Sequence, residues 1–176
     1  MKMDTFTARV DRFQDESLSS IWQYHLAVPL SVAEPYVRED KKRVIVTFLD
    51  GTKKHCALMP RGGGEWYIFI NQKERKALKV EVGDEVPLTL EVDDSPYGMP
   101  VPEELQVLWD QDEEGSKYFH QLTPGKQRTL IHWVSTVKSS DKRITRALVM
   151  LNHVKALKGE VDFKQLNAEV KAANQR

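Results

Sequence analysis

Arg143 and Arg146 are the pair of residues whose type and spacing best suit the binding of a ligand. They lie three positions apart in a stretch with helical periodicity, so both guanidinium groups can reach one phosphate or carboxylate. Lys142 precedes them directly, and His132 falls off the apolar stripe of the preceding predicted helix. We therefore expect Arg143, Arg146, Lys142 and His132 to contribute to an anion-binding site.

The charge distribution around this group supports the same expectation, although the formal net charge of the chain is zero. Between residues 115 and 158 every charged residue is Lys or Arg except Asp141, whereas residues 103–114 carry only acidic charges. A basic surface of this kind can bind the phosphate groups of a nucleic acid or another anion. The alternative is that these side chains are the solvated faces of amphipathic helices, paired in part with the acidic run.

Residues 60–64, with the sequence Pro-Arg-Gly-Gly-Gly, are a second candidate for anion binding. Successive backbone N–H groups beside an arginine can form an anion nest, and we assign Arg61, Gly62 and Gly63 to it. No Gly-Lys-Ser/Thr follows, which excludes a P-loop. A strand-like segment follows instead, whereas a dinucleotide fingerprint leads into a helix. The alternative is a flexible connection between two strands.

No group of residues in the sequence has the pattern of a catalytic or metal site. The five histidines are scattered, and no pair has the i, i+4 spacing of a helical zinc site. His55 and Cys56 are adjacent in a predicted strand, so their side chains point to opposite faces and cannot chelate together. No Gly-x-Ser-x-Gly elbow occurs. We predict no catalytic residue, no metal and no cofactor, and an enzyme is the least favoured function.

Length and composition limit the class of protein. A chain of 176 residues suits one large domain or two small ones. The single cysteine excludes an intramolecular disulfide and suits a reducing compartment. The sequence has neither the apolar core of a signal peptide nor an apolar run of about 18 residues. We therefore predict a cytoplasmic protein with no membrane span.

Alternation of apolar and polar residues predicts strands in the first half of the chain. The expected strands lie at residues 6–10, 22–28, 44–48, 52–59, 66–70 and 86–92. Asp50-Gly51 predicts a tight hairpin turn, and Asn71 predicts the N-cap of a short helix. Pro87 indicates that the last strand begins at an edge or a bulge. Residues 15–20 predict a turn, and residues 31–37 a helical turn that Pro35 weakens.

The periodicity changes beyond a segment rich in proline and glycine at residues 95–102. Downstream, apolar residues recur with helical spacing, and Thr123-Pro124 predicts an N-cap followed by proline at the first helical position. The expected inward residues are Leu105, Leu108, Trp109, Tyr118, Phe119, Leu122, Leu130, Trp133, Val134, Val137, Ile144, Leu148, Leu151, Val154, Phe163, Leu166 and Val170. We predict a domain at 1–94, a linker at 95–102 and a helical domain at 103–176.

The first domain resembles a bacterial family of unknown function with an AbrB-like, swapped-hairpin, double-split β-barrel. The resemblance is carried by Phe6-Thr7-Ala8, Asp50-Gly51, residues 60–64 and residues 77–86. The second domain resembles the bacteriocin-protection, YdeI/OmpD-associated helical family. The matching residues are 101–105, Leu122-Thr123-Pro124, His132-Trp133 and the spacing of Arg143 and Arg146. These resemblances imply an α+β protein, with a small double-split β-barrel followed by a helical domain.

Two functions remain open at this point. The first is a non-enzymatic binding protein, connected with stress or bacteriocin tolerance, that engages an anionic small molecule or a protein partner. The second is an AbrB-like regulator that binds DNA, an expectation that comes from fold-level analogy alone. A homodimer is compatible with both functions, because swapped-hairpin relatives pair through their sheets.

Overall fold

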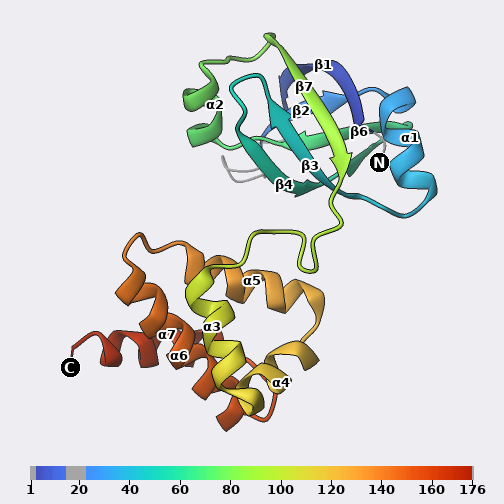
Figure 1. The fold of residues 1–176 in the computed structure, drawn as a ribbon. Coiled ribbons are helices and arrows are strands. Elements are labelled where there is room, and N and C mark those ends of the chain that lie inside the picture. Colours follow the sequence, from blue (N-terminus) through green and yellow to red (C-terminus); the bar gives the residue numbers. More distant parts are fainter. Residues whose placement is uncertain (1–2, 15–22, 176) are drawn as a thin grey trace. The chain divides into compact units, whose positions relative to one another are not determined.

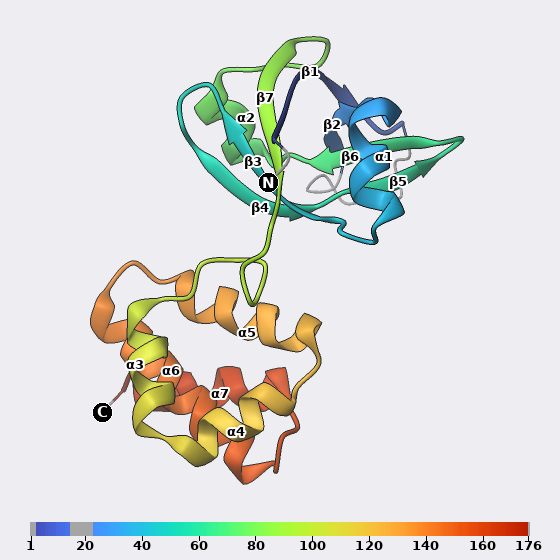
Figure 2. The same cartoon turned by 45° about the vertical axis from the view of Figure 1, so that its right-hand side comes forward.

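The computed structural model describes residues 3–14 and 23–175, and the chain divides into two units, Met1–Gly98 and Met99–Arg176 (Figures 1 and 2). Within the described residues, the first unit holds seven strands in one sheet and two helices, and the second unit holds five helices. The predicted α+β class is therefore confirmed. The division after Gly98 falls inside the segment 95–102 that the sequence predicts as a linker. The predicted turn at 15–20 and Trp22 lie outside the described residues.

The sheet of the first unit has the strand order β4-β3-β7-β1-β2-β6-β5, and all of its neighbouring strands are antiparallel. The strands are β1 (Met3–Arg12), β2 (Tyr24–Val28), β3 (Arg43–Phe48), β4 (Lys53–Ala57), β5 (Met59–Gly62), β6 (Glu65–Phe69) and β7 (Glu85–Val92). The strands at the two ends of this order, β4 and β5, are separated in the chain only by Leu58, which is buried. The chain itself therefore brings the two edges together, and the sheet curls around a core (Figure 2).

The core of this unit follows from the period-two pattern of its strands. Ala8 and Val10 of β1 and Leu88 and Leu90 of β7 are buried, and Arg9 between the first pair is exposed. Successive side chains of a strand point to opposite faces, so the alternation in the sequence selects one face for the core. The predicted inward residues of the first strand are therefore confirmed.

The two long edges of β1 are paired over different lengths. Over Met3–Arg9 it pairs with β7, whereas its pairing with β2 runs only from Val10 to Arg12. The N-terminal part of β1 thus pairs with β7 and its C-terminal part with β2. On the N-terminal side of Val10, β1 and β2 are no longer paired. We call the space between them the split.

Pro87 lies in β7, which is a central strand between β3 and β1. The pairing of β7 with β3 begins only at Leu88, so Pro87 has a paired strand on the β1 side alone. A proline in a strand needs a side without a ladder bond, because it has no N–H to donate. The edge that the sequence indicated is thus the one-sided start of a central strand.

The helix α1 (Leu30–Arg38) is longer than the helical turn expected at 31–37, and it includes Pro35. Proline in a helix interior removes one backbone hydrogen bond and is unfavourable. Here the helix is held by burial of Ala33 and Tyr36. The Tyr36 hydroxyl also contacts the Asp4 carboxylate at 3.0 Å and the Leu90 carbonyl at 2.9 Å. Tertiary contacts therefore outweigh the local weakness that Pro35 introduces.

The second helix, α2 (Gln72–Leu78), begins as its local sequence requires. Asn71 accepts a hydrogen bond from the backbone N–H of Glu74, and the Glu74 side chain accepts one from the N–H of Asn71, which forms a capping box. Lys79 ends the helix in the left-handed conformation, with φ of 57°. The predicted cap at Asn71 is confirmed.

Residues 60–64 form the end of one strand and the turn that connects it to the next. Pro60, Arg61 and Gly62 belong to β5, which pairs with β6 and has an irregular register between Pro60 and Gly62. The strand lies at the end of the sheet order, where a proline can be accommodated on the unpaired side. Gly63 and Gly64 form the turn to β6 with positive φ, which glycine adopts without steric cost.

The second unit is built around α6, which contacts each of the other four helices. Its helices are α3 (Glu103–Gln111), α4 (Glu113–Gln121), α5 (Pro124–Ser135), α6 (Ser140–Ala156) and α7 (Phe163–Ala173). Thr123 caps α5, and Pro124 occupies its first turn, as predicted. No helix of the described residues is long and apolar enough to cross a membrane.

The predicted inward stripe of α6 is partly wrong. Leu151 and Val154 are buried, but Ile144 and Leu148 are exposed. The buried face instead includes Ala147 and Met150. It is therefore rotated around the helix axis away from Ile144 and Leu148. Helix periodicity gives an apolar sector wider than the face that the other helices cover, so it does not decide which edge of the sector is buried.

Two aromatic residues of the helical unit also differ from the expected inward stripe. Trp133 is only half-buried, and its indole N–H donates to Asn167 of α7, while Ile131 next to it is fully buried. Phe163 at the start of α7 is exposed. Trp133 has a polar N–H on an apolar ring, and Phe163 is the first residue of its helix. The burial of such residues depends on how the neighbouring helix packs.

Candidate functional site

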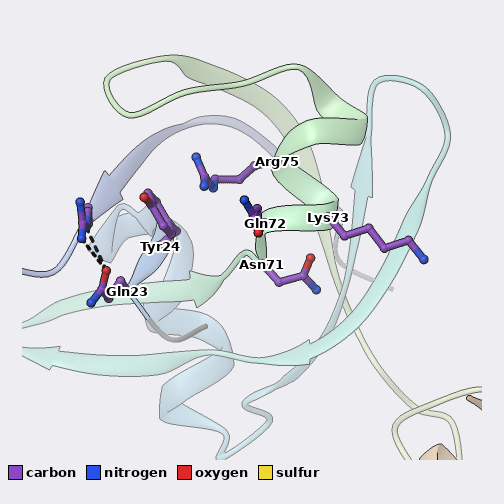
Figure 3. A pocket seen from close by; sticks show the side chains of 7 residues that line it. Gln23, Tyr24, Asn71, Gln72, Lys73 and Arg75 are labelled. Atoms are coloured by element: carbon purple, nitrogen blue, oxygen red, sulfur yellow. Dashed lines mark hydrogen bonds between the residues drawn. The ribbon is translucent and has the colours of Figure 1, made fainter. Parts of the chain in front are cut away.

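A polar pocket opens between the end of the β1–β2 pair and α2, with a volume of about 520 Å³ (Figure 3). Its lining residues are Arg12, Gln23, Tyr24, Asn71, Gln72, Lys73 and Arg75. We call it the Tyr24 pocket, because the ring of Tyr24 lies between its basic groups. Three of the seven lining residues are basic and none is acidic.

Two arginines share the ring of Tyr24. The guanidinium carbon of Arg75 lies 3.5 Å from the ring centroid, and that of Arg12 lies 5.5 Å from it. Both distances are within the range of a cation–π contact. Figure 3 shows the Arg75 side chain extending toward Tyr24, whereas Lys73 extends away from it. The pocket therefore holds two positive charges close together at its centre.

The charges of these two arginines are only weakly compensated. Nε and Nη2 of Arg12 both donate to Oε1 of Gln23, at 3.1 and 2.7 Å, and this partner is neutral. Nη1 of Arg75 lies 3.3 Å from Glu81, whose side chain is 84% exposed. The Arg75 side chain is only 11% exposed, and its buried Nε has no hydrogen-bond partner among the described residues. An anion near both guanidinium groups would reduce their repulsion.

The fold explains why these residues meet. Arg12 ends β1 and Tyr24 begins β2, and the two are directly opposite in the antiparallel ladder. The capping box at Asn71 fixes the start of α2, and Arg75 follows one turn later. The sequence signals the helix through Asn71, but it has no signal for the approach of Arg75 to a strand so distant in the chain. Sequence reasoning therefore missed this pocket.

Arg143 has an intramolecular anionic partner. Its Nη2 donates to Oε1 of Glu104 on α3 at 2.8 Å, and its Nη1 donates to the carbonyls of Val137 and Lys138, at 3.1 and 2.9 Å. Hydrogen bonding to Arg143, first among several contacts, lowers the pKa of Glu104 to about 2. The guanidinium thus ties α3 to the segment that joins α5 and α6.

Arg146 makes contacts of the same kind. Its Nη1 donates to the carbonyl of Trp133 and, at 2.8 Å, to the hydroxyl of Thr136, and its guanidinium carbon lies 4.8 Å from the Trp133 ring centroid. Lys142 and His132 are exposed on α6 and α5. Arg146 therefore binds the end of α5 and Arg143 the segment that follows it, whereas Lys142 and His132 face solvent.

Arg61 lies in the other unit, apart from the residues just described. Its Nη1 is 3.2 Å from Oδ2 of Asp11 and 3.3 Å from Nε2 of the buried His25. The hydrogen bond from the Arg12 backbone N–H lowers the pKa of Asp11, and the hydrogen bond from Arg61 lowers it further. Burial lowers the pKa of His25. Arg61 is thus compensated locally.

Gly62 ends β5 beside Arg61, and Gly63 begins the hairpin turn. Gly62 has φ of 96° and Gly63 of 60°. Arg61 and Gly63, with Gly64, line a cavity of about 490 Å³ at the split, but Gly62 does not line it. Of the three residues assigned to the second anion site, the structure therefore places two on one cavity.

Asp93 and Cys56 are the side chains of the first unit that we considered for acid–base or nucleophilic chemistry. Asp93 is buried and accepts hydrogen bonds from both Ser95 and His55, the latter at 2.8 Å. Burial opposes ionisation, but the bonds from Ser95 and His55 outweigh it, and the pKa of Asp93 is lowered. Burial raises the pKa of Cys56 to about 12. The described residues contain no cluster of three His, Cys, Asp or Glu side chains that could hold a metal ion.

The fold and the site define a two-domain α+β protein with a β-rich domain before a helical one. Residues 6–90 match the family model of a domain of unknown function, DUF1905, and residues 98–156 match the model described as bacteriocin-protection, YdeI or OmpD-associated. The two matches follow one another in the predicted order, which confirms the predicted combination of resemblances. Neither a curated protein nor a solved structure matches the chain.

Proposed function

We propose that the protein is a non-enzymatic binding protein, and that its β-rich domain binds an anionic small molecule in the Tyr24 pocket. The observation that carries the proposal is the placement of Arg12 and Arg75 within 5.5 Å of one ring centroid, in a pocket that no carboxylate of the described residues lines. Gln23 and Gln72 add amide groups that can donate to ligand oxygens. This site replaces Arg143 and Arg146 as the first choice for an anion, since those residues already bind groups of the chain.

The ligand class is a compact polyanion that carries phosphate or carboxylate groups. Arginine presents a planar set of N–H donors that matches either group. The two sources are separated by titrating the full-length protein calorimetrically with sodium pyrophosphate and, separately, with sodium citrate at constant ionic strength. We expect saturable binding of one of them at a single site.

The variant Arg12→Gln tests the site, because Arg12 is exposed and its loss leaves the core untouched. A hydrogen bond to a charged group contributes about 1.5–3 kcal/mol, so we expect the affinity to fall about tenfold or more. Arg38→Gln is the matched control, since Arg38 is an exposed arginine of α1 paired with Glu34. The proposal is wrong if neither probe binds, or if Arg12→Gln and Arg38→Gln bind equally well.

Bacteriocin tolerance is the physiological role that we propose for the whole chain, because the family model matched by residues 98–156 carries that description. The test is survival of a deletion strain under bacteriocin challenge, with the wild-type chain or Arg12→Gln supplied in trans. We expect the wild-type chain to restore survival and Arg12→Gln to restore less. If the wild-type chain and Arg12→Gln restored survival equally, bacteriocin tolerance would not depend on the Tyr24 pocket.

Duplex DNA is a less favoured ligand. The basic residues of the helical unit that suggested it include Arg143 and Arg146. Arg143 binds Glu104 and the segment after α5, and Arg146 binds the end of α5. Binding to phosphates weakens steeply as salt is raised. A mobility-shift assay over a salt series that begins at about 50 mM tests it, and a retained duplex there would favour the regulator instead.

A further inference from the structure

We propose that the split between β1 and β2 is a docking groove for an extended acidic peptide, which adds to the open edge of β1 as an extra strand. The groove lies in the β-rich domain and is distinct from the Tyr24 pocket, with which it shares no lining residue. The argument rests on the direction of the backbone groups of β1, on the cavity beside them and on the charge that lines it.

The backbone groups of β1 alternate between its two neighbours. The N–H of Val10 donates to the Asp84 carbonyl at 2.9 Å, and its carbonyl accepts from the N–H of Gly83 at 2.9 Å. Val10 therefore bonds toward the β7 side. On the other side, the N–H of Phe13 donates to the carbonyl of Gln23, the residue just before β2, at 2.8 Å. In an antiparallel ladder, consecutive residues direct their backbone groups to opposite sides. Even-numbered residues of β1 thus bond toward β7, and odd-numbered residues point toward β2.

Thr5 and Thr7 therefore direct their N–H and carbonyl groups into the split. The pairing of β1 with β2 ends at Val10, opposite Leu26, and no strand of the described residues pairs with Thr5 or Thr7 on this side. Pro87 opposite Thr7 agrees with this direction, because Thr7 needs no N–H from β7. An open strand edge of this kind is a template for pairing with another chain.

A cavity of about 490 Å³ occupies the split beside this edge. Thr7 and Arg9 of β1 form one wall, and Ala27 and Val28 of β2 form the other. Trp66 and Leu30 add apolar surface at the sides, and the Leu30 side chain is 53% exposed. The edge is thus open inside a bounded groove, which favours a single extended segment over unlimited edge-to-edge pairing.

Arg9 sets the charge of the partner. It is exposed, lines the cavity and has no ion pair within the part of the chain that the structure describes. Of the other charged lining residues, Arg61 lies 3.2 Å from Asp11 and 3.8 Å from the exposed Glu65, so its charge is compensated. Arg9 is therefore the basic lining residue that is left for a partner's carboxylate, next to the open backbone groups of β1. A strand that alternates acidic and apolar side chains matches Arg9 and the Trp66 surface together.

The experiment is a titration of the ¹⁵N-labelled full-length protein with the peptide Ac-EVEVEV-NH2, followed by NMR. We expect saturable shifts of the amides of Thr5, Thr7 and Arg9. Ac-KVKVKV-NH2 tests the charge, and Ac-EVEVEV-NH2 methylated on alternate backbone nitrogens tests strand pairing. We expect the basic peptide to bind more weakly, and the methylated peptide to lose about tenfold or more in affinity because it cannot complete the ladder.

Two variants complete the test. Thr7→Pro removes one donor on the open side, where a strand tolerates proline, and we expect it to keep the fold and lose peptide binding. Arg9→Gln should weaken binding about two- to fivefold, the range for an exposed ion pair, whereas Arg38→Gln on α1 should change nothing. If Thr7→Pro fails to fold, the methylated peptide still decides the question.

Three results would overturn the proposal. One is the absence of shifts at Thr5 and Thr7 at millimolar Ac-EVEVEV-NH2. Another is equal affinity of the methylated and unmethylated peptides, which would leave only a charge contact at Arg9. The third is a dimer in light scattering that Thr7→Pro dissociates, because a second copy of this chain would then occupy the groove.

Discussion

Nη2 of Arg143 lies 2.8 Å from Oε1 of Glu104, so this arginine holds a carboxylate of its own chain. The two residues are far apart in the sequence, and their contact joins α6 to α3 at the start of both helices. Arg143 was expected to bind an external anion because its partner is invisible in the local pattern. The same chemistry is used here to fix one helix against another.

Replacement of Glu104 changes how the helical unit responds to acid. The pKa of Glu104 is lowered to about 2, chiefly by the bond from Arg143, from an ordinary value of 4.5. A carboxylate with a lowered pKa in the folded state stabilises that state above its unfolded pKa, and this contribution is lost as the pH falls toward 2. We expect Glu104→Gln to be less stable than the wild type at pH 7, with a smaller difference at pH 3. Urea unfolding followed by tryptophan fluorescence measures both.

Glu103→Gln is the control for this prediction. Glu103 is exposed in the same first turn of α3, so it shares the position relative to the helix dipole but has no ion pair with Arg143. A pH dependence as large in Glu103→Gln as in Glu104→Gln would assign the effect to the helix terminus.

His153 contacts α7 through both of its ring nitrogens, one at the N-cap Asp162 and the other at Glu169 within the helix. The Asp162 backbone N–H donates to Nε2 at 3.1 Å, so the ring proton is on Nδ1, which donates to Glu169 at 2.9 Å. The side chain is fully buried. His153→Leu would remove the acceptor of the Asp162 N–H and the donor to Glu169, and we expect a loss of about 1 kcal/mol in the free energy of unfolding. Faster amide exchange at Asp162 should accompany it. His132→Leu, at an exposed histidine, should have little effect.

Lys79 and Lys76 should respond in opposite directions to the same substitution. Lys79 ends α2 with φ of 57°, a conformation that favours glycine, and Lys76 is exposed within the helix. Lys79→Gly should therefore stabilise the protein by about 0.5–1 kcal/mol, whereas Lys76→Gly should destabilise it by about 1 kcal/mol. Thermal unfolding of both variants measures the difference. A destabilised Lys79→Gly would mean that the lysine side chain makes a contact worth more than the backbone strain.

Arg75 and Tyr24 should be energetically coupled. The guanidinium lies 3.5 Å from the ring centroid and is largely shielded from solvent. A double-mutant cycle with Arg75→Met and Tyr24→Leu should give a coupling of about 1 kcal/mol. Glu81→Gln removes the exposed partner of Arg75, and we expect it to change stability by less than about 0.5 kcal/mol. A coupling near zero in the cycle would show that the two side chains are adjacent without mutual stabilisation.

The features that the sequence predicted well are those decided by a few neighbouring residues. The Asp50-Gly51 turn joins β3 and β4 with φ of 82° at Gly51, and Asn71 and Thr123 cap their helices. In each case the residue type supplies the backbone angle or the hydrogen bond itself. The family resemblance predicted the order of the two domains for a related reason, because it rests on several short sequence motifs in each domain.

The features that it missed depend on contacts distant in the chain. Pro35 is tolerated because Tyr36 is buried against β1 and β7, and Ile144 is exposed because no neighbouring helix covers it. The Tyr24 pocket has the same origin. Arg12 and Arg75 belong to different elements, and only the β1–β2 ladder and the packing of α2 bring them to one ring.

The place of β7 between β3 and β1 has a consequence for how the chain folds as it is made. Met3 lies opposite Glu91, so the first strand to leave the ribosome must wait for the last strand of its sheet. Until then β3 and β1 have no common neighbour, and the apolar faces of both remain uncovered. Such non-local pairing slows folding. A nascent chain interrupted before Glu85 would thus lack the element that unites the barrel, and it would expose its interior to the quality-control machinery of the cell.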